Sequence, residues 1–213
     1  MNKKDLLWGL ALFSIVVFLV NPSTHQLFIK YNAAHPYIAG FIKFALLATL
    51  GDLLAARIVA KKWKKPSGLI FRMFIWGFLG MVIVIIFSIF AQGVTAALKV
   101  GLLPGATSSL AFAFFTSAIM NLTFAPTMMA FHRFTDTFAD LKFGKGKSNI
   151  STAEVVGTID WNGFVSFVLF KTIPLFWIPA HTITFLLPPA YRVLAAAFLS
   201  IALGAILSFA KKQ

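Results

Sequence analysis

The chain has 213 residues, of which 59% are hydrophobic and 12% are charged, and it contains no cysteine. Soluble domains average about 45–50% apolar and about 25% charged residues, so the composition indicates an integral membrane protein built as one compact bundle. The lack of cysteine excludes disulfides, thiolate metal sites and a cysteine nucleophile. The formal net charge of +13 is compatible with nucleic-acid binding, but its distribution along the chain argues for membrane topology instead, and we expect no nucleic-acid partner.

Six apolar runs are expected to cross a hydrocarbon core that is roughly 30 Å thick. In chain order they are residues 6–20, 36–60, 69–97, 106–131, 161–187 and 190–210. Most lysines and arginines then fall on one side, around residues 3–4, 61–65, 133–147 and 211–212, whereas the other side holds Lys30, Lys99 and Arg192. The positive-inside rule predicts that both termini lie on the cytoplasmic side of a prokaryotic inner membrane, or on the matrix side if the membrane belongs to an organelle.

Hydrophilic breaks are expected between the spans, at residues 21–35, 61–67, 99–105 and 132–150. The last break contains Gly146-Lys147-Ser148, but the earlier glycine of a phosphate-binding loop is missing, so we expect a basic loop that faces lipid headgroups. The sequence Ser151-Thr-Ala-Glu154 then matches a capping box, which predicts a short amphipathic helix along the inner surface.

The fifth apolar run contains Pro174 and Pro179 and ends at Pro188. Proline lacks a backbone N–H and kinks helices, and broken helices at membrane depth are tolerated only against protein or a water-filled cavity. We therefore expect an all-α, polytopic membrane bundle whose proline-broken fifth span lines a cavity.

Asp52 is the only acidic residue deep inside an apolar run. A charge at that depth costs roughly 2.5–3.5 kcal/mol on insertion scales, so it needs a partner or a cavity. It lies on a stripe of small residues at helical spacing, with Ala45, Ala48, Thr49, Ala55 and Ala56. Two interpretations stay open. The stripe is either a packing seam in which Asp52 pairs with Arg57 or Arg72, or a seam that opens on a polar cavity.

Two lysines lie inside apolar runs. Lys43 is close enough to the end of its span to extend its ammonium group outward to the membrane surface, and we expect it to do so. Lys171 lies near the middle of the fifth run, where a buried lysine must pair, titrate or face water. It is the best basic candidate for a pore or for a partner of Asp52.

Neutral polar side chains supply the remaining pore candidates. Thr116, Asn121 and Thr123 belong to the fourth run, and the alternative role for the threonines is hydrogen bonding to their own backbone. His181 shares a helix face with Trp177 in the fifth run, and structural hydrogen bonding is the alternative to a place in the path. The histidines are otherwise scattered and no catalytic constellation is visible, so we expect no enzyme, no metal and no cofactor.

Several motifs occur in a fixed order and resemble those of the Mpv-seventeen / peroxisomal-membrane-protein-twenty-two family. They are His35-Pro36 with Gly51-Asp52, Arg72 with Gly77 and Gly80, Phe124-Ala125-Pro126, the series Trp177, Pro179, Phe185, Pro188 and Arg192, and finally Ile206-Leu207-Ser208. The resemblance covers residues 31–208, and it makes residues 1–30 an additional N-terminal span and loop before a family-like bundle of residues 31–213. It implies a weakly selective membrane channel for small solutes and metabolites.

The sequence therefore predicts a channel or transporter of low selectivity for small solutes, with its path between the second, fourth and fifth spans. The alternative is a non-transporting membrane protein that binds lipid or scaffolds partners. A third possibility is a proton-coupled carrier that uses Asp52 and His181. The expected partners are membrane lipids and a small-molecule or ion solute, and a homo-oligomer is compatible with each interpretation.

Overall fold

The structure of this chain is a computed structural model that describes residues 3–210, with side chains described up to residue 206. The first two and last three residues, including Lys211 and Lys212 of the predicted basic C-terminus, lie outside it. Within the described range the chain is helical and forms no strand. Five helical segments are long and apolar enough to cross a membrane, and the bent N-terminal pair adds a sixth only when its two helices are counted together as one span. The predicted all-α membrane bundle is confirmed.

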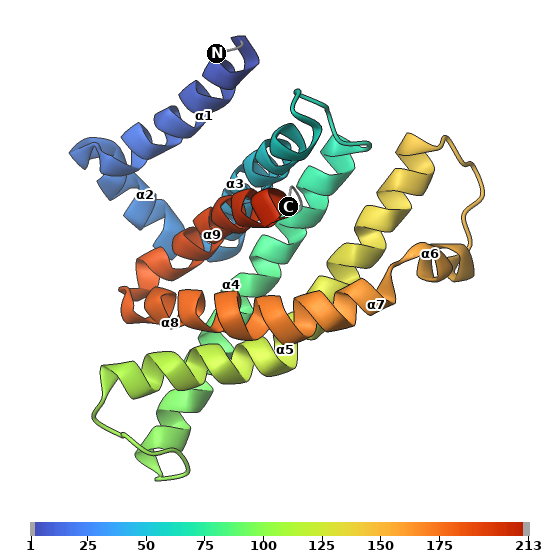
Figure 1. Cartoon of the computed structure of the whole chain (residues 1–213). Helices are drawn as coiled ribbons and strands as arrows, with labels where there is room; N and C mark the ends of the chain where they lie inside the picture. The colour runs from blue at the N-terminus through green and yellow to red at the C-terminus, as the bar shows by residue number, and fades with distance from the viewer. Residues whose placement is uncertain (1–2, 211–213) are drawn as a thin grey trace.

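The elements follow the chain without long loops (Figure 1). The structure assigns α1 (Lys3–Val20), α2 (Pro22–Ala34), α3 (Pro36–Ala60), α4 (Leu69–Lys99), α5 (Ser109–Ala139), η1 (Asp140–Gly144), α6 (Thr152–Thr158), α7 (Trp161–Gly163), η2 (Phe164–Trp177), α8 (Ile178–Leu186) and α9 (Pro189–Ala210), where η1 and η2 are π-helical. We call the end of the bundle where α3 ends, α4 begins and α5 ends the basic end, because the lysine-rich loops lie there.

Residues 21–35 were expected to be a hydrophilic break, and this prediction is wrong. They form α2, which meets α1 at 84°. The side chain of Asn21 accepts a hydrogen bond from the backbone N–H of Ser23, and Pro22 occupies the first turn, where its missing N–H costs nothing. The two signals start a new helix directly after α1.

Helix α3 is the centre of the bundle and packs most extensively against α4 and α9. It begins at Pro36 and ends at Ala60, and the next residue, Lys61, has a left-handed φ of 55°. Glycines permit the close approaches, since a Cβ on Gly40 would lie 2.8 Å from the carbonyl oxygen of Gly80, and one on Gly51 would lie 3.0 Å from that of Ser200. These contacts fix α3 between its two neighbours.

The break predicted at residues 132–150 is shorter than expected. Helix α5 continues to Ala139 and η1 extends the helical backbone to Gly144. His132, Arg133 and Asp136 are therefore held on a rigid helix. Beyond the loop, the Ser151 hydroxyl accepts the Glu154 N–H at 3.1 Å, so Ser151 is confirmed as the N-cap of α6, while the Glu154 carboxylate pairs with Lys147.

The fifth apolar run is helical from Trp161 to Leu186. Its irregularity takes the form of widened turns, because η2 is π-helical over fourteen residues and contains Pro174. π-Helix is rare and usually confined to single turns, often at functional sites. The main buried core lies near the opposite end of the bundle, where α8 and α9 meet α3, α4 and α5, and its members are Phe44, Leu47, Ala48, Ile83, Phe87, Ala113, Met120, Phe185, Ala196 and Ala197.

Candidate functional site

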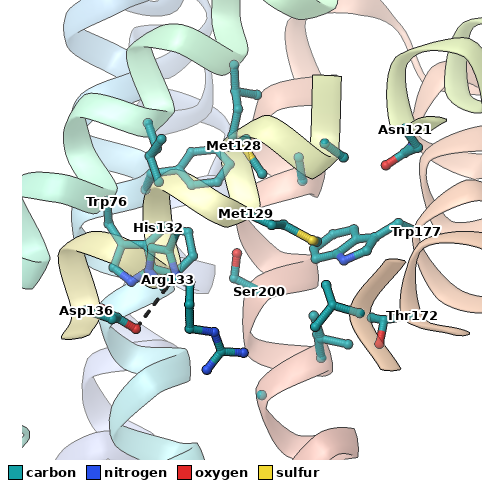
Figure 2. A pocket seen from close by; sticks show the side chains of 18 of the residues that line it. Trp76, Asn121, Met128, Met129, His132, Arg133, Asp136, Thr172, Trp177 and Ser200 are labelled. Atoms are coloured by element: carbon teal, nitrogen blue, oxygen red, sulfur yellow. Dashed lines mark ion pairs between the residues drawn. The ribbon is translucent and has the colours of Figure 1, made fainter. Parts of the chain in front are cut away.

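A cavity of about 740 Å³ enters the bundle from its basic end, between α3, α4, α5, η2, α8 and α9. Its polar lining residues at the basic end are Asp52, Trp76, His132, Arg133, Asp136 and Ser200, and those at the deep end are Asn121, Thr172, Trp177 and His181. Figure 2 labels all of them except Asp52 and His181. Val59, Arg133 and Phe167 line it and are exposed, so the cavity opens to the surface beside them. Asn121 and Arg133 are twelve residues apart on α5, which at 1.5 Å per residue gives a depth of about 18 Å.

Asp52 lies in the cavity wall and is half-buried. Trp76 donates its indole N–H to Asp52 Oδ2 at 2.8 Å. Among the described residues, this is the one hydrogen bond that the carboxylate accepts. The Trp76 ring also packs on His132, with 4.1 Å between the ring centroids.

The pairing of Asp52 with Arg57 or Arg72, one of the two interpretations of the sequence, is not observed. Arg57 donates to Asp5 Oδ1 at 3.1 Å, which holds α1 against α3. Arg72 forms ion pairs with Asp136 and with Asp140, the latter at 2.8 Å. Both arginines are thus engaged by carboxylates that come from other helices, and Asp52 remains available to the cavity.

The predicted small-residue stripe of α3 serves both purposes that the sequence left open. Ala45 and Ala48 are buried in the packed core, so the half of the stripe away from the basic end is a packing seam. Asp52, Ala55 and Ala56 line the cavity. The seam therefore opens into the cavity at Asp52.

The second carboxylate of the wall, Asp136, is neutralised locally. It pairs with Arg72, and His132 Nδ1 lies 3.7 Å from its other oxygen (Figure 2). Arg133 is the neighbouring wall residue, and its guanidinium group has no ion-pair partner among residues 3–206. In Figure 2 its side chain extends downward, to the left of Ser200.

At the deep end, α5 and α8 are joined by a buried hydrogen bond. Asn121 Nδ2 donates to the carbonyl of Ser117 at 2.8 Å and lies 3.0 Å from His181 Nδ1. His181 Nδ1 also lies 3.2 Å from Asn121 Oδ1, so it accepts from the amide N–H in one tautomer and donates to the amide oxygen in the other. Trp177 stacks on the same imidazole at 5.0 Å and Phe87 meets it edge-on at 5.6 Å. The structure thus brings together two pore candidates that lie sixty positions apart in the sequence.

Three other pore candidates are not in the cavity, and these predictions are wrong. Thr116 is fully buried and donates to the carbonyl of Phe112 at 2.7 Å. Thr123 is exposed and donates to the carbonyl of Ile119 at 2.6 Å. Both use the backbone bonding that was the alternative. Lys171 is exposed on the outside of the bundle and neither lines the cavity nor contacts Asp52.

The π-helix explains why Lys171 was misplaced. Phe167, Thr172 and Trp177 all line the cavity at a spacing of five residues, which is the hydrogen-bond spacing of a π-helix and not of an α-helix. Lys171 then shares the outer face with Phe170 and Leu175, which are 72% and 76% exposed. Thr172 lines the cavity, a position that the period of an α-helix does not predict for it.

The cavity is closed at its deep end by aromatic rings. Phe87 packs against Phe185 at 4.9 Å between centroids, and Phe112 meets Phe185 edge-on at 6.5 Å. The guanidinium group of Arg192 lies 5.4 Å from the Phe112 ring and 5.6 Å from the Phe185 ring, a cation–π arrangement. Its Nε–H also donates to the carbonyl of Leu187 at 2.9 Å.

Lys43 does not extend to the surface, which corrects that expectation. It is 8% exposed, its ammonium group donates to Asn32 Oδ1 at 2.5 Å, and it lies 5.7 Å from the Phe28 ring. Both partners belong to α2. Because residues 21–35 fold as a helix over this position, the lysine is covered.

The remaining motif residues have structural positions. His35 precedes α3 and its carbonyl accepts the Ala39 N–H at 2.9 Å, and Pro36 starts that helix. Gly51 lies against the α9 backbone, Pro126 is inside α5, and the carbonyl of Pro188 accepts the Tyr191 N–H at 3.0 Å.

Five residues at the basic end of the cavity were not singled out from the sequence as site residues: Trp76, His132, Arg133, Asp136 and Ser200. The spacing of four between His132 and Asp136 is a readable signal, because it places both on one helix face. The meeting of Trp76 with Asp52 has no sequence signature, since it depends on how α3 and α4 cross.

No family model, no curated protein and no solved structure matches this chain.

Proposed function

We propose that this protein is a membrane channel or transporter of low selectivity that admits small solutes through the cavity at its basic end. The observation that carries the proposal is the cavity itself, which has a volume of about 740 Å³ and polar groups at both ends. Small-molecule sites are typically concavities of about 300–1,000 Å³ with a few placed polar groups. The resemblance to the Mpv-seventeen / peroxisomal-membrane-protein-twenty-two family supports the same function.

The position of the polar residues supports transport over a purely structural role. An ionisable residue at membrane depth is expected to face a cavity or a partner, and Asp52 has a cavity and one neutral donor. The deep end is closed by Phe87, Phe112 and Phe185. This arrangement corresponds to a path that is open at the basic end and closed by an aromatic layer toward the other side.

Lipid binding is the second candidate, because the middle of the cavity is apolar. Its wall there is built largely from Ile83, Ile86, Phe124, Met128, Met129, Phe164 and Leu203. Such a wall accommodates an acyl chain as readily as an apolar solute. In this case the protein would retain lipid and leave vesicles impermeable.

Osmotic swelling of vesicles separates the two candidates. Purified protein is reconstituted, and the entry of glycerol, erythritol and glucose is followed by stopped-flow light scattering. We expect entry above that of protein-free vesicles, and we expect Met129→Trp, which fills the cavity, to abolish it. Thr123→Trp on the lipid-facing side of α5 is the matched control. Vesicles that stay impermeable while the purified protein carries a stoichiometric lipid contradict the transport proposal and favour lipid binding.

A further inference from the structure

The cavity wall carries two groups of opposite charge, Asp52 and Arg133, and neither forms an ion pair with another described residue. Asp52 on α3 has one hydrogen bond, from the neutral indole of Trp76, to Oδ2. Its Oδ1 is free to accept. Arg133 on α5 is exposed at the cavity entrance, without an ion-pair partner in the part of the chain that the structure describes.

These two groups do not neutralise each other, because they come from different walls. Helices α3 and α5 each pack extensively on α4 but not on one another, and the cavity lies between them. No ion pair joins Asp52 to Arg133 among the pairs formed by the described residues. A solute in the basic half of the cavity therefore meets a carboxylate on one side and a guanidinium on the other.

The other charges nearby are already compensated. Arg72 pairs with both Asp136 and Asp140, and His132 lies beside Asp136. What remains is Asp52, a negatively charged hydrogen-bond acceptor, and Arg133, a positively charged hydrogen-bond donor, with apolar wall next to them. A solute with only a negative charge is attracted by Arg133 and repelled by Asp52. A solute with only a positive charge is attracted by Asp52 and repelled by Arg133.

We propose that the cavity prefers zwitterionic solutes, which bind with an ammonium group at Asp52 and a carboxylate or phosphate at Arg133. A short apolar spacer between the two charges then lies against the wall formed by Met128 and Met129. Hydrogen bonds between charged groups are shorter and stronger than neutral ones, and a guanidinium binds a carboxylate with two parallel N–H donors. This inference rests on the proposed function and names its substrate class.

Uptake of four solutes of equal length tests the inference in phosphatidylcholine vesicles at pH 7. They are 4-aminobutyrate as the zwitterion, 4-hydroxybutyrate as the anion, 4-aminobutanol as the cation and butane-1,4-diol as the neutral solute, each corrected for protein-free vesicles. We expect 4-aminobutyrate to enter fastest. Asp52→Asn and Arg133→Gln are each expected to reduce its preference over the diol roughly tenfold, the effect of losing one hydrogen bond to a charged group. Lys171→Gln, which removes an exposed cation outside the cavity, is expected to change nothing.

The outcomes distinguish this inference from the proposed function. Equal entry of all four solutes, or unchanged selectivity in both variants, overturns the inference and leaves the transport proposal standing, whereas entry of none overturns both. The exchange variant Asp52→Arg with Arg133→Asp restores both charges in reversed positions, so its recovery of 4-aminobutyrate uptake distinguishes lost binding from lost folding. Vesicles containing phosphatidylethanolamine separate a soluble zwitterion from a headgroup, since a bound headgroup lowers 4-aminobutyrate uptake by competition.

Discussion

Replacing Gly80 with alanine is expected to separate α3 from α4 and to destabilise the bundle. A Cβ at this position would lie 2.7 Å from Phe44 Cβ and 2.9 Å from the carbonyl carbon of Gly40. The carbonyl is backbone and cannot rotate away. The added atom therefore forces apart α3 and α4, the two helices that carry Asp52 and Trp76.

The magnitude follows from a matched substitution on the same helix. Gly93 is also inside α4, and a Cβ there meets nothing within 4 Å. Both alanines gain the same helix propensity, about 1 kcal/mol relative to glycine, so their difference isolates the packing clash. Overpacking of a tight contact typically costs about 1–3 kcal/mol. We expect Gly80→Ala to be less stable than Gly93→Ala by that amount.

The assay is reversible unfolding in mixed micelles by titration with sodium dodecyl sulfate, followed by circular dichroism. The free energy of unfolding is compared for the wild type and both variants. Gly93→Ala is expected to equal or exceed the wild type. If Gly80→Ala is as stable as Gly93→Ala, then the two helices do not cross at Gly40 and Gly80, and the position assigned to Asp52 loses its basis.

Two further predictions concern the polar contacts of the cavity wall. Asn121→Ala leaves His181 Nδ1 without its hydrogen-bond partner in a buried position and is expected to lower the free energy of unfolding by about 1–3 kcal/mol. A change of less than about 0.5 kcal/mol in the same titration would contradict the buried bond. Arg72→Gln leaves Asp136 without its guanidinium partner and is expected to destabilise the protein, with Asp136→Asn recovering part of the loss in a double-mutant cycle; additive losses would show that the two residues do not interact.

Helix boundaries were predictable wherever the sequence carries a local signal. The second span was placed at residues 36–60 because proline starts it and lysines follow it, and the structure has α3 as Pro36–Ala60. The capping box at Ser151 likewise gave the start of α6. In contrast, α2 and the last turns of α5 were taken for breaks because their residues are polar. They are helical because caps and ion pairs to other helices stabilise them.

Site residues were predictable only where the α-helical period holds. Asp52, Asn121 and His181 were selected for their depth, and all three line the cavity. Lys171 was selected by the same argument, but the π-helix directs it to the outside and brings Thr172 to the wall. The change from α-helical to π-helical hydrogen bonding, which alters the period of the helix, is not encoded in a local pattern of polarity. Tertiary packing decides it.

Thiol labelling of single cysteines tests the central claim that a water-accessible cavity opens at the basic end of the bundle. The chain has no native cysteine, so Ser200→Cys in the cavity and Thr123→Cys outside it each provide one thiol. Lys62→Cys marks the basic end. A membrane-impermeant methanethiosulfonate reagent is expected to modify Ser200→Cys from the side that also modifies Lys62→Cys, and to leave Thr123→Cys unmodified. Ser200→Cys that is as unreactive as Thr123→Cys, or that reacts only from the opposite side, would contradict the account.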